Sequence, residues 1–131
     1  MRWSKRDIKR MTGELDGVWL RSRPPPSLLG PPDTGPFLQW LSANRQQLVV
    51  EGLKGLANLS AHREQKDRET AEHWLQRFDS REVHDRFRGL AEEEVRKRRP
   101  LLQLIARIEE HGLPPEVVAY DPTCHRAVEG A

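Results

Sequence analysis

The sequence predicts an all-α protein: a small antiparallel helical bundle or a long helical hairpin, preceded by a basic N-terminal helix and a Pro-rich linker. From residue 37 onward, apolar residues recur at the spacing of a helix face. Residues 91–99 place acids four positions ahead of bases, a spacing that supports a helix. Six of the ten prolines fall in residues 24–36, and prolines favour extended backbone, so this stretch is predicted to be a linker.

Composition limits both the core and the charge. The chain has 131 residues, of which 36% are hydrophobic and 32% are charged, so one modest domain with a small core is expected. The formal net charge is only +2, which means that nucleic acid would have to be held by a local basic patch. The single cysteine excludes an internal disulfide, and no signal peptide or membrane span is recognised, so the expected location is the cytoplasm.

The chain is divided into four parts by these patterns. Residues 1–20 are a basic N-terminal helical segment, residues 21–36 a Pro-rich linker, residues 37–120 a helical domain, and residues 121–131 a C-terminal tail. The tail is expected to fray, as chain ends do when nothing ties them down.

The N-terminal segment carries the most specific binding feature of the sequence. Five basic residues are candidates for binding nucleic acid: Arg2, Lys5, Arg6, Lys9 and Arg10. Such a surface fits an arm on nucleic-acid phosphates, a helix on an anionic membrane, or a solvated helix that packs on the body through Trp3 and Ile8. Asp7 and the short apolar face count against the membrane.

A second basic cluster could extend a phosphate-binding surface. It consists of Arg96, Lys97, Arg98 and Arg99. The acids directly before it favour a different interpretation, in which Glu92 and Glu94 pair with bases four residues later on one solvated helix face.

Residues 37–78 are predicted to form one long helix. Residues 62–70 contain no apolar residue, but also no Gly, Pro or Asn, so the helix should continue there with every side exposed. His62, His73 and His84 recur every eleven residues, about 16 Å apart along a helix axis. One metal ion cannot reach two of them, and we expect His62 and His73 on the solvent side.

Two more helices are predicted after a break near residue 79. Asp79 can cap a new helix, and Glu82 would complete a capping box. This helix should span about residues 80–99, with Pro100 ending it or starting the next one at residues 100–111. Gly112 suits the residue after a helix end.

The predicted core combines large side chains from all three helices. The core candidates are Trp40, Leu53, Leu56, Trp74, Phe78, Phe87, Leu101, Ile105 and Ile108. Residues 37–61 carry more apolar surface than short helices can cover, which predicts self-association or a partner groove. The candidate partner-binding residues are Phe37, Leu38, Trp40 and Leu41.

No set of residues predicts catalysis. Cys124 and His125 are the only Cys/His neighbours, and adjacent side chains usually point apart, so we assign them no catalytic or metal role. The sequence contains no GxxxxGK[ST], GxGxxG, GxSxG or HExxH motif. We therefore expect no enzyme, no cofactor and no metal, but a non-catalytic adaptor, assembly or regulatory subunit; the alternative is a small nucleic-acid-binding regulator.

Overall fold

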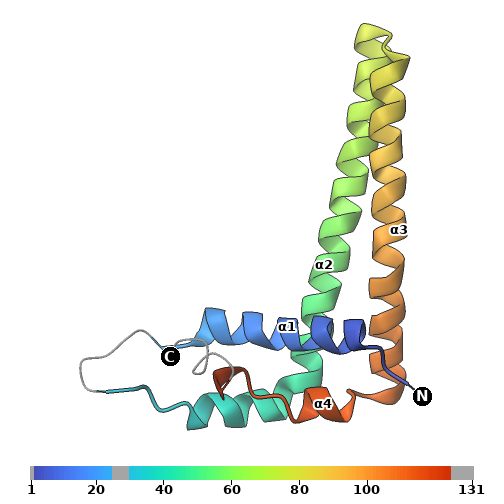
Figure 1. Ribbon diagram of the computed structural model, residues 1–131. Helices are drawn as coiled ribbons and strands as arrows, with labels where there is room; N and C mark the ends of the chain where they lie inside the picture. Colours follow the sequence, from blue (N-terminus) through green and yellow to red (C-terminus); the bar gives the residue numbers. More distant parts are fainter. Residues whose placement is uncertain (1, 25–29, 125–131) are drawn as a thin grey trace. The chain divides into compact units, whose positions relative to one another are not determined.

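The computed structural model describes residues 2–24 and 30–124, and every regular element within these ranges is a helix (Figure 1). The all-α prediction is confirmed. The elements are α1 (Lys5–Ser22), α2 (Gly35–Phe78), α3 (Arg81–His111) and α4 (Pro115–Val118). None of the described helices is both long enough and apolar enough to cross a membrane.

Hydrogen bonds to backbone groups are present at both ends of helix α1. Ser4 is the N-cap, and its hydroxyl oxygen accepts a hydrogen bond of 3.0 Å from the Asp7 amide. At the other end the Arg23 amide donates to the Trp19 carbonyl over 2.8 Å. The helix thus continues to Ser22, into the predicted linker of residues 21–36, of which residues 25–29 lie outside the described residues.

The chain divides into two compact units. The first unit comprises residues 1–52 and 108–131, and the second unit comprises residues 53–107. Because α2 and α3 each contribute residues to both units, each unit is described by itself below.

The first unit has a core of large apolar side chains. Its fully buried members are Met11, Leu15, Leu41, Val49, Pro114, Val117, Pro122 and Ile108. They come from α1, the start of α2, the end of α3, and α4 and its flanks. Helix α1 also approaches α2 closely at Gly52. The Glu14 carboxylate occupies the space that a Cβ at this position would fill, so the absence of a side chain on Gly52 permits the contact.

Hydrogen bonds between distant residues close the first unit around α4. Arg45 Nη1 donates to the Val117 carbonyl over 3.0 Å and to the Tyr120 carbonyl over 2.6 Å. The Tyr120 hydroxyl in turn donates to Asp16 Oδ1 over 2.6 Å. The Arg45 guanidinium therefore connects α2 to α4 and to Tyr120, and the Tyr120 hydroxyl connects the residues after α4 to α1.

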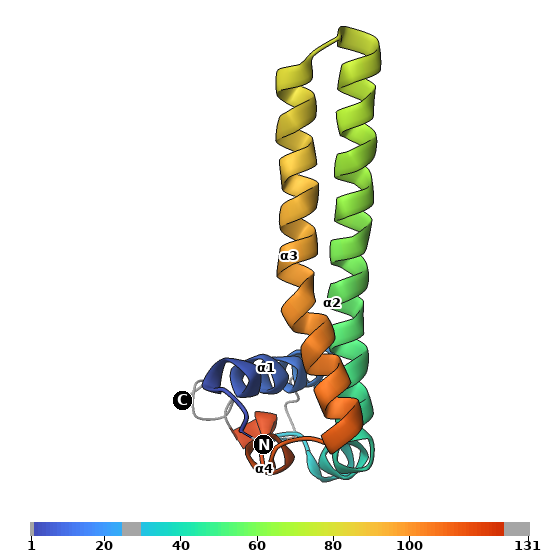
Figure 2. The ribbon, with the colours of Figure 1, turned by 90° about the vertical axis from the view of Figure 1, so that its right-hand side faces the viewer.

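The second unit is a pair of helix segments that lie side by side and run in opposite directions (Figures 1 and 2). Its α2 seam buries Leu53, Ala57 and Ser60, spaced by four and three residues, and later Ala71. In α3, Ala91 is fully buried. This spacing is that of a heptad seam, in which small residues let two helices approach closely.

The seam corrects part of the predicted core. Leu53, Leu101, Ile105 and Ile108 are buried as predicted, but Leu56 is 39% exposed, Trp40 44% and Phe78 59%. Leu59, three residues after Leu56, is 45% exposed. A contact between two helices covers only a narrow stripe, so leucines that flank the seam remain outside it.

The break between α2 and α3 falls where it was predicted, but the roles of its residues differ. Asp79 has φ 49° and its amide donates to the Leu75 carbonyl over 3.1 Å, so it ends α2. Ser80 is the residue that caps α3, since its hydroxyl accepts a bond of 3.4 Å from the Val83 amide. Glu82 forms no capping box but lies 3.9 Å from Arg86.

Helix α3 passes through Pro100 without ending, so the predicted boundary at this residue is wrong. Proline costs one amide donor and leaves the carbonyl four residues earlier without its helical partner. Pro100 is exposed, so solvent can reach that part of the backbone. The buried residues Leu101, Leu104 and Ile105 follow it directly and hold the helix in place.

Candidate functional site

The basic residues at the N-terminus lie on the outer side of α1. Arg2, Lys5, Arg6, Lys9 and Arg10 are all exposed. At 100° per residue, the four that belong to the helix occupy an arc of about 140°. The buried residues of the helix occupy a separate arc: Met11, Leu15, Val18 and Trp19. We call Lys5, Arg6, Lys9 and Arg10 the basic face of α1.

Three of the four bases of this face are not ion-paired with a described carboxylate. Within the described residues, no carboxylate lies at ion-pair distance from Lys5, Arg6 or Lys9. Glu14 lies against Gly52, and burial there raises its pKa, although the charges of Arg21 and Arg10 act in the opposite direction.

The second basic cluster is partly paired with acids inside the second unit. Lys97 Nζ lies 3.3 Å from Glu93 Oε1, and Arg98 Nη2 lies 2.7 Å from Glu64 Oε1. The hydrogen bond from Arg98, followed by that from Arg68, lowers the pKa of Glu64. Arg96 and Arg99 are exposed. Two of the four bases are therefore ion-paired, but with Glu93 and Glu64. The predicted pairs of Glu92 with Arg96 and of Glu94 with Arg98 are not among the ion pairs of the described residues, and Glu94 accepts a hydrogen bond from Ser60 instead. The cluster belongs to the second unit, whereas the basic face of α1 belongs to the first.

The predicted partner-binding residues separate into a buried and an exposed part. Leu41 is fully buried and belongs to the core of the first unit, whereas Phe37 and Leu38 are half-buried. The ring centroids of Trp19 and Phe37 are 5.0 Å apart, and those of Phe37 and Trp40 are 5.9 Å apart. These three rings form an aromatic row that begins in the core and ends on the surface at Trp40.

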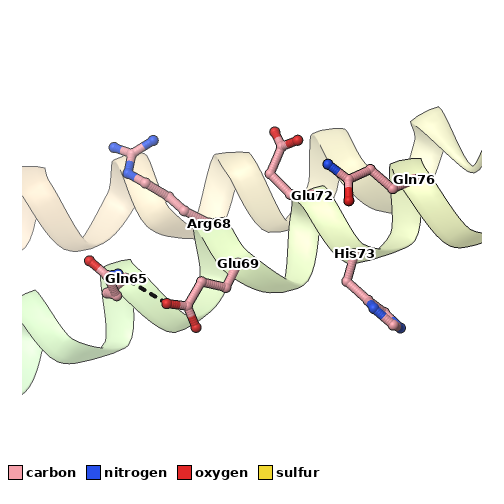
Figure 3. Close-up of a pocket in the computed structure, with 6 residues that line it drawn as sticks. All are labelled: Gln65, Arg68, Glu69, Glu72, His73 and Gln76. Atoms are coloured by element: carbon pink, nitrogen blue, oxygen red, sulfur yellow. Dashed lines mark hydrogen bonds between the residues drawn. The ribbon is translucent and has the colours of Figure 1, made fainter.

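A shallow groove on α2 is lined by polar side chains that do not point toward a common centre. Its lining residues are Gln65, Arg68, Glu69, Glu72, His73 and Gln76. Figure 3 shows the amide of Gln65 bonded to Glu69, and the His73 ring pointing away from the Glu72 carboxylate. Glu72 instead lies 3.7 Å from Nε2 of the buried His84. The part of the chain that the structure describes has no cluster of three or more His, Cys, Asp or Glu residues suited to a metal.

Cys124 takes part in a local hydrogen-bonded turn through its backbone amide. Its amide donates to Asp121 Oδ1 over 3.3 Å, and its side chain is exposed. Burial raises the pKa of Asp121, but hydrogen bonds from Thr123 and Cys124 outweigh this effect and leave the value below the ordinary one. His125, the other half of the Cys/His pair, lies outside the described residues.

Two sets of interacting residues could not be found by reading the sequence. Arg45 and Tyr120 are 75 positions apart, and Asp16 and Tyr120 are 104 apart. Glu64 and Arg98 are 34 apart. No spacing rule connects residues at such separations, so only the fold reveals these contacts.

Comparison with known proteins places this chain in no family. No family model matches it, and neither a curated protein nor a solved structure is significantly similar to it. Its function is therefore inferred from its own surfaces.

Proposed function

We propose that the protein is a non-catalytic helical adaptor or assembly subunit that acts through protein–protein contacts. The observation that carries this proposal is the aromatic row of Trp19, Phe37 and Trp40, whose last ring is 44% exposed. Large aromatic side chains in well-packed surroundings contribute most of the binding energy at protein interfaces.

The base of the aromatic row is buried. Trp19 is 7% exposed, and Leu41, the next residue after Trp40, is fully buried. A side chain held by such neighbours loses little conformational freedom when it is covered, so the entropic cost of binding through Trp40 is low. This favours Trp40 as the anchor of a contact over the scattered leucines elsewhere on the surface.

The second unit supports the same role. We propose that it acts as an antiparallel helical hairpin, a stiff spacer with small apolar areas for further contacts. Leu56 and Leu59 are exposed and three residues apart, so they share one side of α2. Both belong to residues 37–61, the segment with surplus apolar surface.

Light scattering of the purified chain over a range of concentrations tests the proposal, together with binding of an apolar dye. We expect the wild-type chain to self-associate or to bind the dye, and Trp40→Glu to reduce both while the helical circular dichroism is unchanged. Val118→Glu is the matched control, because Val118 is 55% exposed in the same unit but outside the aromatic row. A stable monomer that binds no dye would contradict the proposal.

A further inference from the structure

We propose that the basic face of α1 binds the phosphate backbone of nucleic acid. This interaction is separate from the protein contact assigned to Trp40. It involves Lys5, Arg6, Lys9 and Arg10, which share one side of a single helix.

The fold itself gives no reason for these four cations. They are exposed, and no described carboxylate pairs with Lys5, Arg6 or Lys9. They also occupy the N-terminal part of α1, where the helix dipole is positive and favours acids over bases. Their concentration there lowers the stability of the helix slightly, so an external anion explains it better than folding does.

Their arrangement suits a polyanion. Lys5 and Arg6 are followed one turn later by Lys9 and Arg10, about 6 Å farther along the axis. Four positive charges thus lie within two turns, although the whole chain carries a formal charge of only +2. A local concentration of this kind attracts a row of phosphates more strongly than it attracts a single anion.

The buried side of α1 decides between nucleic acid and a lipid surface. A helix that lies on an anionic membrane inserts its apolar side among the acyl chains. In this protein that side is already covered, because Met11 and Leu15 are fully buried and Val18 and Trp19 nearly so. Leu20 is a large apolar residue of α1 that stays exposed, at 44%, and one such side chain offers little surface for insertion among acyl chains. The four exposed cations are therefore the main feature that α1 offers to a partner, which favours the phosphate backbone.

The test is fluorescence anisotropy of a labelled mixed-sequence DNA duplex with the full-length protein at about 50 and 200 mM salt. Each phosphate contact contributes about −0.9 to the slope of log K against log salt, so four contacts predict roughly a 100-fold loss of affinity over this range. The double variant Lys5→Gln/Lys9→Gln should bind more weakly and reduce the magnitude of the slope by about 2.

The matched control is Arg96→Gln/Arg99→Gln, which removes the same net charge from exposed positions of the second unit. This control should bind like the wild type. An equal loss in both double variants would overturn the proposal, because net charge alone would then explain the binding. No binding at about 50 mM salt, or binding to vesicles of anionic phospholipid but not to the duplex, would overturn it as well.

Discussion

The two units of this protein stabilise their helices by different means. The first unit buries large apolar side chains, such as Met11, Leu15 and Leu41. The second unit also buries Leu53, Leu101, Leu104 and Ile105, but elsewhere along its seam the buried apolar residues are alanines: Ala57, Ala71 and Ala91. Since burial contributes roughly 25 cal/mol per Å² of apolar surface, alanine contributes far less than leucine or methionine. The comparison indicates that part of a long helix pair can pack through small side chains, provided that other contacts align the two helices.

Polar contacts set the register in the second unit. Ser60 Oγ donates to Glu94 Oε2 over 2.8 Å, and Arg98 bonds to Glu64 over 2.7 Å, while both members of the latter pair are less than a fifth exposed. Arg98 Nη1 is buried without a hydrogen-bond partner. We infer that these groups contribute alignment more than net stability, as polar groups in helix seams often do.

The largest effect should separate a buried leucine of the first unit from an exposed leucine of the second unit. Leu15→Ala removes a fully buried side chain of the first unit and should lower the free energy of unfolding by about 2–5 kcal/mol. Leu59→Ala in the second unit should change it by no more than about 1 kcal/mol, because Leu59 is already 45% exposed. Urea unfolding followed by circular dichroism measures both. Equal losses would mean that Leu59 is buried after all.

The next largest effect should come from the hydrogen bonds of the first unit. Arg45→Gln removes the guanidinium that serves the carbonyls of Val117 and Tyr120, and should cost about 1–3 kcal/mol. Tyr120→Phe removes only the bond to Asp16 and should cost less. Amide exchange of α4 reports the same change locally, and an unchanged rate in Arg45→Gln would show that the guanidinium does not hold this segment.

A smaller effect is expected for the ion pair of the second unit. Glu64→Gln should destabilise the protein, because the guanidinium of Arg98 then loses its ionised partner while it remains largely shielded from solvent. The double variant Glu64→Leu/Arg98→Leu should recover most of that loss. Thermal unfolding of the three chains checks this order. A double variant less stable than the single one would show that the pair contributes net stability.

The smallest effect compares two glycines within helices. A Cβ at Gly89 would meet nothing within 4 Å, so Gly89→Ala should stabilise the second unit by up to about 1 kcal/mol. Gly52→Ala should gain less or nothing, because its Cβ would displace the carboxylate of Glu14. Thermal unfolding resolves the two, and an equal gain would show that Glu14 moves aside freely.

The sequence predicted the elements better than it predicted their contacts. Proline content, helical spacing and the helix-breaking residues around Asp79 were enough to expect helices and one break. The helix boundary predicted at Pro100 was wrong, because proline alone does not end a helix when the apolar residues that follow it are buried.

The seam and the surfaces could not be predicted because their signals are weak or non-local. Ala57, Ser60 and Glu64 are small or polar, so the apolar pattern of the sequence predicted Leu56 as a core residue instead. The basic face of α1 could be listed from the sequence, but only the fold shows that no described carboxylate pairs with Lys5, Arg6 or Lys9. The burial of Leu41 beside the exposed Trp40 is likewise a property of the packed unit.

Lowering the pH should affect the stability of the two units differently, because the pKa of Glu64 in the second unit is lowered and the pKa of Glu14 in the first unit is raised. The lowered pKa of Glu64 means that its stabilising effect is present above the unfolded value and is lost as the pH falls through the folded pKa. The raised pKa of Glu14 means that its ionised form costs stability, and that this cost is relieved as the pH falls through its folded pKa. Glu14→Gln should therefore stabilise the protein at neutral pH and abolish the gain on acidification.

The most direct test of the difference between the units is residue-resolved hydrogen exchange at about pH 6 and about pH 3, corrected for intrinsic exchange rates. On acidification, amides around Ser60 and Glu64 in α2 should lose protection, while those around Met11 and Leu15 in α1 should retain it. Loss of protection in α1 first, or an equal loss in both units, would contradict the conclusion that ionised side chains contribute to the seam around Glu64, whereas apolar packing holds α1.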